Sequence, residues 1–409
     1  MNKMKKVPKI RFEEFAEDWE NTDASIIFKT YFDKNHPDLP VLSASQEYGM
    51  IIREDVGFKV QHNKENEAGY KRVLPGQFVI HLRSFQGGFA HSDVEGITSP
   101  AYTIIEFRDK SQQDDIFWKY VLTSKEFIKR LETVTYGIRD GRSISFEDFS
   151  ELGFNVPDIK EQRKIGKTLT VIDTLIRKLE QKLEKLRNIK QSLLNQIFVN
   201  VNRGGYAPLI RFNGYNNKWI MLTLNDISER ITRKNTNNES SLPLTVSAQY
   251  GLINQNDFFD SRIASKDVSG YYLIKNGEFA YNKSSSDGYP FGAVKRLDRY
   301  KMGVLSTLYI IFALNKDKID SDFLSIFFET DKWYEHISQR AAEGARNHGL
   351  LNISSEDFLD LKILTPKSKN EQNLIAGYVS ALDRLVEGTS SKLTKLRTMK
   401  QSLLQKMFV

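Results

Sequence analysis

Short loops rich in Arg, Lys, Asn, Gln and Ser are the segments of this sequence whose residue types could do chemistry. Arg can bridge guanine with two hydrogen bonds, Asn or Gln can do so for adenine, and all five residue types bind phosphates or base edges. Glycines within the loops let a backbone come close to a ligand. The candidate nucleic-acid contacts are Tyr48, Arg83, Ser84, Gln86, Arg139, Arg142, Tyr250, Asn282, Lys283, Ser284, Ser285, Tyr289, Arg346, Asn347 and His348.

Each loop taken alone is explained at least as well by a solvated turn. What favours binding is that the loops come in pairs at equivalent places of two halves of the chain. The loop at Arg83 matches the loop at Asn282, the loop at Arg139 matches the loop at Arg346, and Tyr48 matches Tyr250.

Catalytic motifs of several classes are absent from the sequence. There is no Asp/Asn-Pro-Pro-Tyr/Phe motif for adenine methylation, no Gly-rich cofactor loop after a strand, and no ATP-binding phosphate loop. The six His residues show no i,i+4 pair, and no Cys is present. One nuclease-like string combines Asp158 with Glu180 and Lys182, but the predicted helix between them keeps these residues apart. We therefore predict no catalytic site, no metal and no cofactor bound by this chain.

Bulk properties are compatible with a nucleic-acid partner but do not require one. The 59 Lys and Arg residues exceed the 52 Asp and Glu residues, giving a net charge of +7. The lack of Cys and of an apolar leader favours a cytoplasmic location. The longest apolar-rich run, residues 304–314, is too short to span a membrane and is predicted to be one buried strand.

The sequence contains an internal repeat, in which one unit occurs twice. Pro8-Lys-Ile-Arg-Phe12 returns as Pro208-Leu-Ile-Arg-Phe212, and the segment from Glu161 to Val199 aligns without a gap with Glu371 to Val409, at 17 identical positions of 39. A period this long indicates domain duplication and not a solenoid. The predicted domains are 1–157 and 201–367, two globular target-recognition domains, each followed by a spacer helix at 158–200 and 368–409.

Both spacer segments carry apolar residues at heptad spacing, which is typical of helices that pair. The first stripe contains Ile165, Leu169, Ile172, Ile176, Leu179, Leu183 and Leu186, and then shifts through Ile189, Leu193 and Ile197. The second contains Ile375, Val379, Leu382, Val386, Thr389, Leu393, Leu396, Met399, Leu403 and Met407. A capping box is expected at each start, with Glu161 and Glu371 as its acidic members. A helix of about 38 residues extends about 57 Å, longer than a small domain is wide, so an antiparallel coiled coil is more plausible than two core helices.

The globular parts are predicted to be α+β. Strands are expected near residues 77–82, 101–107, 271–274 and 308–312, and helices over Ile116–Leu131 and Asp322–Ala341.

This arrangement resembles the specificity subunit of type I restriction–modification systems. The resemblance rests on Lys190-Gln-Ser-Leu-Leu194 and Lys400-Gln-Ser-Leu-Leu404, and on the entries Pro157…Glu161-Gln162 and Pro366…Glu371-Gln372. It implies that each domain reads one half of a split site in double-stranded DNA. It also implies two methyltransferase (modification) subunits that use S-adenosylmethionine, and restriction/translocase subunits that use ATP and Mg²⁺, as partners.

Two other functions stay open at this stage. The chain could be a self-sufficient DNA methyltransferase or nuclease with unrecognised motifs, or a coiled-coil interaction protein that does not bind DNA.

Overall fold

The computed structural model describes residues 7–45, 48–56, 64–81, 88–134, 144–199, 207–258, 265, 267–341 and 350–408. The chain divides into two units, Met1–Gln181 with Ser390–Val409, and Lys182–Thr389. We call residues 7–156 head 1 and residues 207–365 head 2. Each unit combines one head with parts of the two long helices. No helix among the described residues is long and apolar enough to cross a membrane.

Head 1 is built around a four-stranded antiparallel sheet in the order β2-β9-β6-β7. Three two-stranded sheets pair β1 with β10, β3 with β4, and β5 with β8. The strands are β1 (Glu20–Asp23), β2 (Phe28–Tyr31), β3 (Leu42–Ser45), β4 (Gly49–Ile52), β5 (Lys71–Val73), β6 (Phe78–Ile80), β7 (Phe89–His91), β8 (Gly96–Thr98), β9 (Thr103–Phe107) and β10 (Gly153–Val156). The helices are α1 (Ala24–Ile27), α2 (Asp115–Leu122), α3 (Lys125–Val134) and α4 (Phe146–Ser150), with 3-10 turns at Arg53–Val56 and Lys64–Gly69.

Head 2 repeats this topology with the sheet order β12-β19-β16-β17. Its two-stranded sheets pair β11 with β20, β13 with β14, and β15 with β18. The strands are β11 (Ile220–Thr223), β12 (Ser228–Ile231), β13 (Leu244–Ser247), β14 (Gly251–Asn254), β15 (Tyr272–Lys275), β16 (Phe279–Asn282), β17 (Ala293–Arg296), β18 (Met302–Leu305), β19 (Ile310–Leu314) and β20 (Lys362–Thr365). The helices are α6 (Leu224–Ile227), α7 (Gln255–Phe258), α8 (Ser321–Phe327), α9 (Tyr334–Arg340) and α10 (Ser355–Leu359).

The α+β prediction is confirmed, although three elements were predicted too long. The run 304–314 is not one strand, because β18 ends at Leu305 and the exposed Leu308 lies in a turn before β19. The helix expected over 116–131 is interrupted where the Ser124 hydroxyl accepts a hydrogen bond from the Phe127 amide (3.1 Å) and caps α3. The helix expected over 322–341 is likewise divided into α8 and α9 by a turn in which Thr330 bonds back to Phe327.

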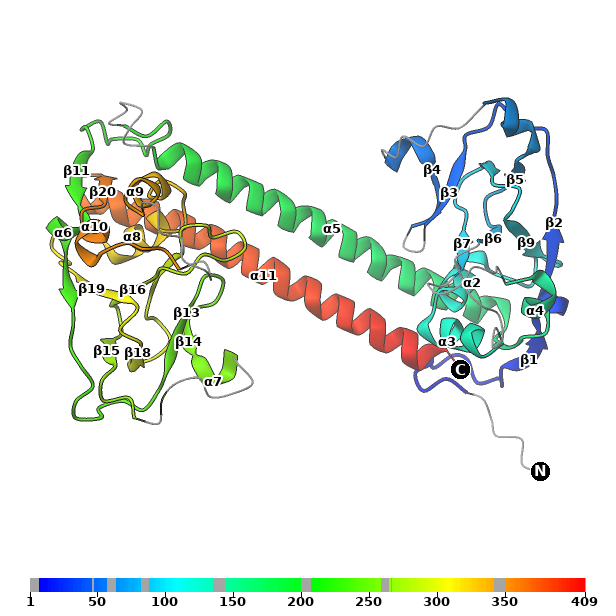
Figure 1. The fold of residues 1–409 in the computed structure, drawn as a ribbon. Helices are drawn as coiled ribbons and strands as arrows, with labels where there is room; N and C mark the ends of the chain where they lie inside the picture. The colour runs from blue at the N-terminus through cyan, green and yellow to red at the C-terminus, as the bar shows by residue number, and fades with distance from the viewer. Residues whose placement is uncertain are drawn as a thin grey trace. The chain divides into compact units, whose positions relative to one another are not determined.

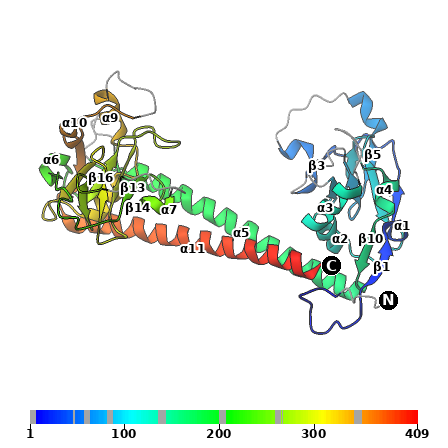
Figure 2. The same cartoon turned by 60° about the horizontal axis from the view of Figure 1, so that its bottom comes forward.

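Helices α5 (Ile159–Ile197) and α11 (Lys369–Met407) lie side by side and run antiparallel (Figures 1 and 2). In the first unit, Asp173 early in α5 forms an ion pair with Lys400 late in α11, at 2.6 Å. In the second unit, Lys190 late in α5 forms an ion pair with Asp383 early in α11, at 2.5 Å. The repeat equates Asp173 with Asp383 and Lys190 with Lys400, so the two pairs are copies of one contact.

Most of the predicted apolar stripe faces inward, but two of its members do not. Ile189 is 52% exposed and Met399, its copy, is 44% exposed. The residues that follow them, Lys190 and Lys400, turn toward the opposite helix to reach its Asp, which leaves the preceding side chain outside. Helix α11 continues through Gly388, and Thr389 is buried where α5 has Leu179.

A buried carboxylate fixes each head to the start of a long helix. We call this carboxylate and its hydrogen-bond partners the root of the head. Glu161 in the first turn of α5 accepts two hydrogen bonds from the Arg11 guanidinium (both 2.8 Å) and one from the Trp19 indole (3.1 Å). Glu371 in α11 accepts the same set from Arg211 (2.6 and 2.8 Å) and Trp219 (3.2 Å). The predicted capping box at α5 is only half formed: the Asp158 carboxylate accepts from the Glu161 amide at 3.0 Å, but the Glu161 carboxylate bonds to the head and not back to the helix start. The Glu371 carboxylate likewise bonds to the head.

The Gln that follows each Glu is buried as well and extends the root. Gln162 accepts from the Asp114 amide (2.9 Å) and donates to the Pro157 carbonyl (2.9 Å). Gln372 does the same with Asp320 (2.7 Å) and Pro366 (2.8 Å). The repeated Pro…Glu-Gln string is thus a device that joins a helix start to a head.

Removing one partner of a buried bidentate pair leaves the other charge without compensation. We expect Glu161→Gln to destabilise the first unit by about 2 kcal/mol, below the full cost of a broken buried pair because Arg11 keeps some access to solvent. Urea unfolding of the full chain measures this loss. Glu14, which pairs with Lys164 on the surface, supplies the control, since Glu14→Gln should leave the free energy of unfolding nearly unchanged. Equal losses for the two variants would contradict the assignment.

Candidate nucleic-acid interface

The two tyrosines predicted to contact DNA occupy the same turn in the two heads. Tyr48 lies between β3 and β4, where its amide donates to the Ser45 hydroxyl at 3.2 Å. Tyr250 lies between β13 and β14, where its amide donates to the Ser247 hydroxyl, also at 3.2 Å. A glycine with positive φ follows each tyrosine, and the side chains are 61% and 57% exposed. The sequence match between these positions therefore reflects one local structure built twice.

In head 2 the end of β16 joins two of the predicted loops. The Asn282 amide nitrogen donates to the Val246 carbonyl of β13 at 3.2 Å, and its amide oxygen accepts from the Ser284 backbone at 3.0 Å. The Asn282 side chain thus holds the loop that follows it beside the Tyr250 hairpin. One N–H and one lone pair remain for a ligand.

The loop after Asn282 is also held to the segment that follows the predicted loop at Arg346. The Lys283 carbonyl accepts from the Leu351 amide at 3.0 Å, and the Lys283 ammonium lies 3.4 Å from the Ile353 carbonyl. Ser284 pairs with Leu350. Ser285 is exposed and Tyr289 is half-buried, closing a turn with two backbone bonds to Ser286.

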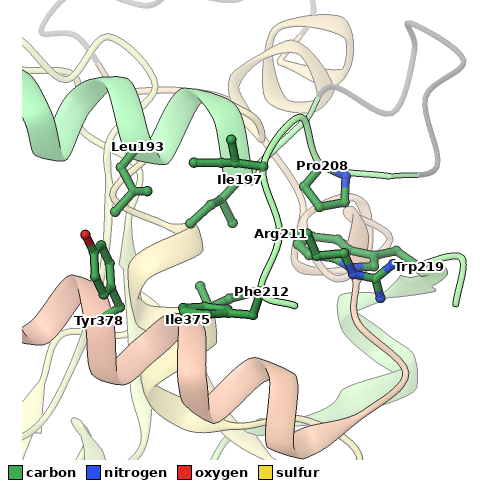
Figure 3. A pocket seen from close by; sticks show the side chains of 9 residues that line it. Leu193, Ile197, Pro208, Arg211, Phe212, Trp219, Ile375 and Tyr378 are labelled. Carbon is green, nitrogen blue, oxygen red and sulfur yellow. The ribbon is translucent and has the colours of Figure 1, made fainter. Parts of the chain in front are cut away.

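An apolar pocket of about 270 Å³ lies elsewhere in the second unit, between the end of α5 and the start of α11 (Figure 3). It is lined by Leu193, Ile197, Pro208, Ile210, Arg211, Phe212, Trp219, Ile375 and Tyr378. The only charged group of the lining, Arg211, is bound to Glu371. This lining suits an apolar side chain and not a phosphate.

Two solved structures are similar to this chain, and the first of them shares its fold. The crystal structure of the type I restriction–modification S subunit from M. genitalium matches with a TM-score of 0.59 at 15% identity, over 98% of this chain and 99% of that chain. The HsdS subunit from Thermoanaerobacter tengcongensis matches with a TM-score of 0.48 at 14% identity, over 95% of this chain and 96% of that chain. Residues 10–188 match the family model of the type I restriction modification DNA specificity domain.

Residues 10–188 are therefore similar to a type I restriction–modification DNA specificity domain. The resemblance to specificity subunits is confirmed, and DNA target recognition is the function that this domain family serves. The family match covers head 1 and most of α5, while head 2 repeats the strand order of head 1.

Several of the predicted DNA contacts lie outside the described residues. These are Arg83, Ser84, Gln86, Arg139, Arg142, Arg346, Asn347 and His348. Tyr48, Tyr250, Asn282, Lys283, Ser284, Ser285 and Tyr289 are described, and those of head 2 gather around the end of β16. Their contact with DNA stays a prediction.

Sequence reasoning missed His81, which stands in head 1 where head 2 has Asn282. Its amide donates to the Gly88 carbonyl at 2.8 Å. Burial lowers the pKa of His81, so its ring is neutral at pH 7, and its buried Nε2 has no partner among the described residues. The signal was available, because Gly76-Gln77-Phe78 aligns with Gly277-Glu278-Phe279 and places His81 opposite Asn282.

A basic side chain between two carboxylates supports the sheet edge beside the Tyr48 turn. His91 lies 2.8 Å from Asp115 and 3.3 Å from Asp93, and its carbonyl is where a side chain on Gly49 would clash. Head 2 builds the same cluster with Arg296 (Asp298 at 2.6 Å, Asp322 at 2.7 Å). Burial alone would lower the pKa of His91, but its hydrogen bond to Asp115 and the negative charge of nearby Asp93 outweigh burial and raise it. His91 in turn lowers the pKa values of Asp93 and Asp115.

The titratable His91 should make the stability of the first unit depend on pH in a way that Arg296 does not impose on the second. Because the folded pKa of His91 is raised, its contribution is complete below about pH 6.5 and is lost as pH rises through the folded value. The carboxylates act oppositely, and their contribution is lost in acid. We expect His91→Arg to remove the loss of stability above pH 6.5 in thermal unfolding measured from pH 5 to 9.

Arg296→His is the reciprocal variant and should give the second unit a new loss over the same pH range. If neither substitution alters the pH profile, the ion cluster does not govern this dependence.

Proposed function

We propose that the chain is the sequence-reading specificity subunit of a type I restriction–modification complex, in which each head reads one half of a bipartite DNA target. The observation that carries this proposal is that the roots of the two heads are copies: Glu161 and Glu371 bind the same set of residues, and the Lys–Asp pairs between the helices repeat. Two copies of a reading head on an antiparallel helix pair suit a target in two separated parts.

Equivalent apolar side chains on the outside of the long helices support docking of two modification subunits. Leu175 of α5 and Leu385 of α11 are copies, 45% and 52% exposed. An exposed apolar side chain at the same place of each helix is what a partner protein would cover.

Catalysis is proposed to reside in the partners. The modification subunits would bind S-adenosylmethionine, and restriction/translocase subunits would use ATP and Mg²⁺, since the sequence carries none of the corresponding motifs. The pure chain mixed with DNA, S-adenosylmethionine and Mg²⁺ should show no turnover until modification subunits are added. Turnover by the chain alone would instead favour a self-sufficient enzyme.

The helix pair is proposed to set the unread gap of the target. Inserting seven residues after Lys182 in α5 and seven after Lys392 in α11 keeps the heptad phase and adds about 10.5 Å, or about three base pairs. Methylation mapping of DNA from cells with the original chain should give a two-part motif, and the insertion variant should lengthen its gap alone. A motif whose gap stays fixed would rule out the spacer role, and a motif without a gap would rule out the bipartite target.

Each docking face should hold one modification subunit. We expect Leu175→Glu to reduce the complex from two modification subunits per chain to one, because burying a carboxylate in an apolar contact is costly. Native mass spectrometry of the assembled complex measures this stoichiometry. Glu184→Gln, on another face of α5, is the matched control and should keep both subunits. Retention of both subunits by Leu175→Glu and Leu385→Glu would place the docking surface elsewhere.

A further inference from the structure

An exposed aromatic ring in head 1 is shared by two ammonium groups. Phe32, in the loop that follows β2, is 69% exposed. The Lys34 ammonium lies 5.1 Å and the Lys71 ammonium 5.9 Å from the centre of its ring. At both distances a cation is attracted to the face of an aromatic ring. The loop and the first residue of β5 thus hold two positive charges beside one ring.

No carboxylate among the described residues forms an ion pair with either ammonium group. Asp33 directly precedes Lys34, but the Arg72 guanidinium binds its carboxylate at 3.2 Å. The Lys71 ammonium donates to the Tyr102 carbonyl, a neutral acceptor, at 2.6 Å. Burial lowers the pKa of Lys71, and the positive charge of Lys34 lowers it further. A bound anion would offset this repulsion, so the two lysines favour a negatively charged ligand.

Head 2 places a lysine on an aromatic ring at the same point, although the ring comes from another strand. The repeat equates Lys34 with Lys234. Lys71 begins β5 and corresponds to Tyr272, which begins β15, because these strands pair in the same register with β8 and β18. The Lys234 ammonium lies 4.2 Å from the centre of the Tyr272 ring, while Thr232 replaces the phenylalanine of head 1. The contact between lysine and ring is thus retained while the residue that supplies the ring changes.

Both contacts lie on the segment from which a predicted DNA-contacting hairpin starts. The loop with Lys34 leads from β2 to β3, and the loop with Lys234 leads from β12 to β13. In head 1 the Ile97 amide of β8 donates to the Pro40 carbonyl just before β3, at 2.9 Å. This bond joins the start of the hairpin to the two-stranded sheet that carries Lys71.

We infer that Lys34, Lys71 and the Phe32 ring form a phosphate-binding site for the DNA backbone in head 1. Lys234 and the Tyr272 ring form the corresponding site of head 2, with one ammonium group beside the ring instead of two. A lysine binds a phosphate as a point charge, and such contacts position a protein on a duplex without reading its bases. This inference rests on the proposed function and adds a backbone contact to each head.

The test measures DNA affinity against salt for the full chain assembled with its modification subunits. The probes are a duplex with the methylated motif and a random-sequence duplex, because phosphate contacts form on any DNA. We expect Lys34→Gln and Lys234→Gln each to make the plot of log affinity against log salt less steep by about 0.9, the value for one lost phosphate contact. The change should be the same on both duplexes, and the methylated motif should stay unchanged. Lys34→Arg keeps the charge and should keep the slope.

Lys29→Gln is the matched control, since Lys29 lies on β2 and its charge is already paired with Glu106 at 3.2 Å. This variant should keep the slope of the original chain. Thermal unfolding checks that every variant folds.

Replacing the phosphates of the motif one at a time by neutral methylphosphonates locates each contact. Neutralising the phosphate that meets Lys34 should weaken binding by the original chain and leave binding by Lys34→Gln unaffected. The phosphate found in the same way for Lys234 should lie in the other half of the motif.

Unchanged slopes for both Gln variants would overturn the inference, as would an equal change for Lys29→Gln, which would indicate a general effect of charge. Loss of a modification subunit from the Lys34→Gln complex in native mass spectrometry would assign this lysine to a protein contact instead. If the original complex methylates no two-part motif, the proposed function fails, whereas the slopes on the random duplex still decide the phosphate site.

Discussion

Side chains from both long helices complete the core of each head, and the rest of the structure depends on this sharing. Phe408 at the end of α11 lies 5.6 Å from Phe117 of head 1, ring centre to ring centre. Phe198 at the end of α5 lies 5.3 Å from Phe323 of head 2. Each head therefore packs on the start of one helix and on the end of the other. Neither core is therefore complete without the antiparallel pair of helices. The register of the two helices and the position of each head on them are fixed by the same contacts.

The repeat and the helices could be predicted from the sequence because their signals are local and doubled. Heptad spacing and the near-copy of one tail by the other required no knowledge of contacts between distant segments. The errors arose where a distant partner decides the outcome. Glu161 has the spacing of a capping box, yet Arg11, 150 residues away, takes its carboxylate. Ile189 fits the apolar stripe, yet the next residue, Lys190, points to the opposite helix and pairs with Asp383. Ile189 therefore lies on an exposed face of α5.

The candidate site was predictable only as a set of loops. Residue type drew attention to Asn282, but only the tertiary structure shows that its side chain ties two loops together. Residue type gave no reason to select His81, because its significance comes from its place at the end of β6. The chemistry of a DNA-reading loop depends on which donors and acceptors are left after the loop has made its internal hydrogen bonds. The sequence alone does not show which groups these are.

The two heads also show which features of the scaffold are fixed and which can be exchanged. Both keep a basic side chain between two carboxylates at the sheet edge, but His91 fills that place in one and Arg296 in the other. There the charge pattern is retained while the residue changes, as expected when electrostatic balance and not side-chain identity is the constraint. Each head also contacts an ion pair of the helices, but the contact is the Tyr120 hydroxyl on Asp173 in one and the Glu329 carboxylate on Lys190 in the other, so its charge is not retained.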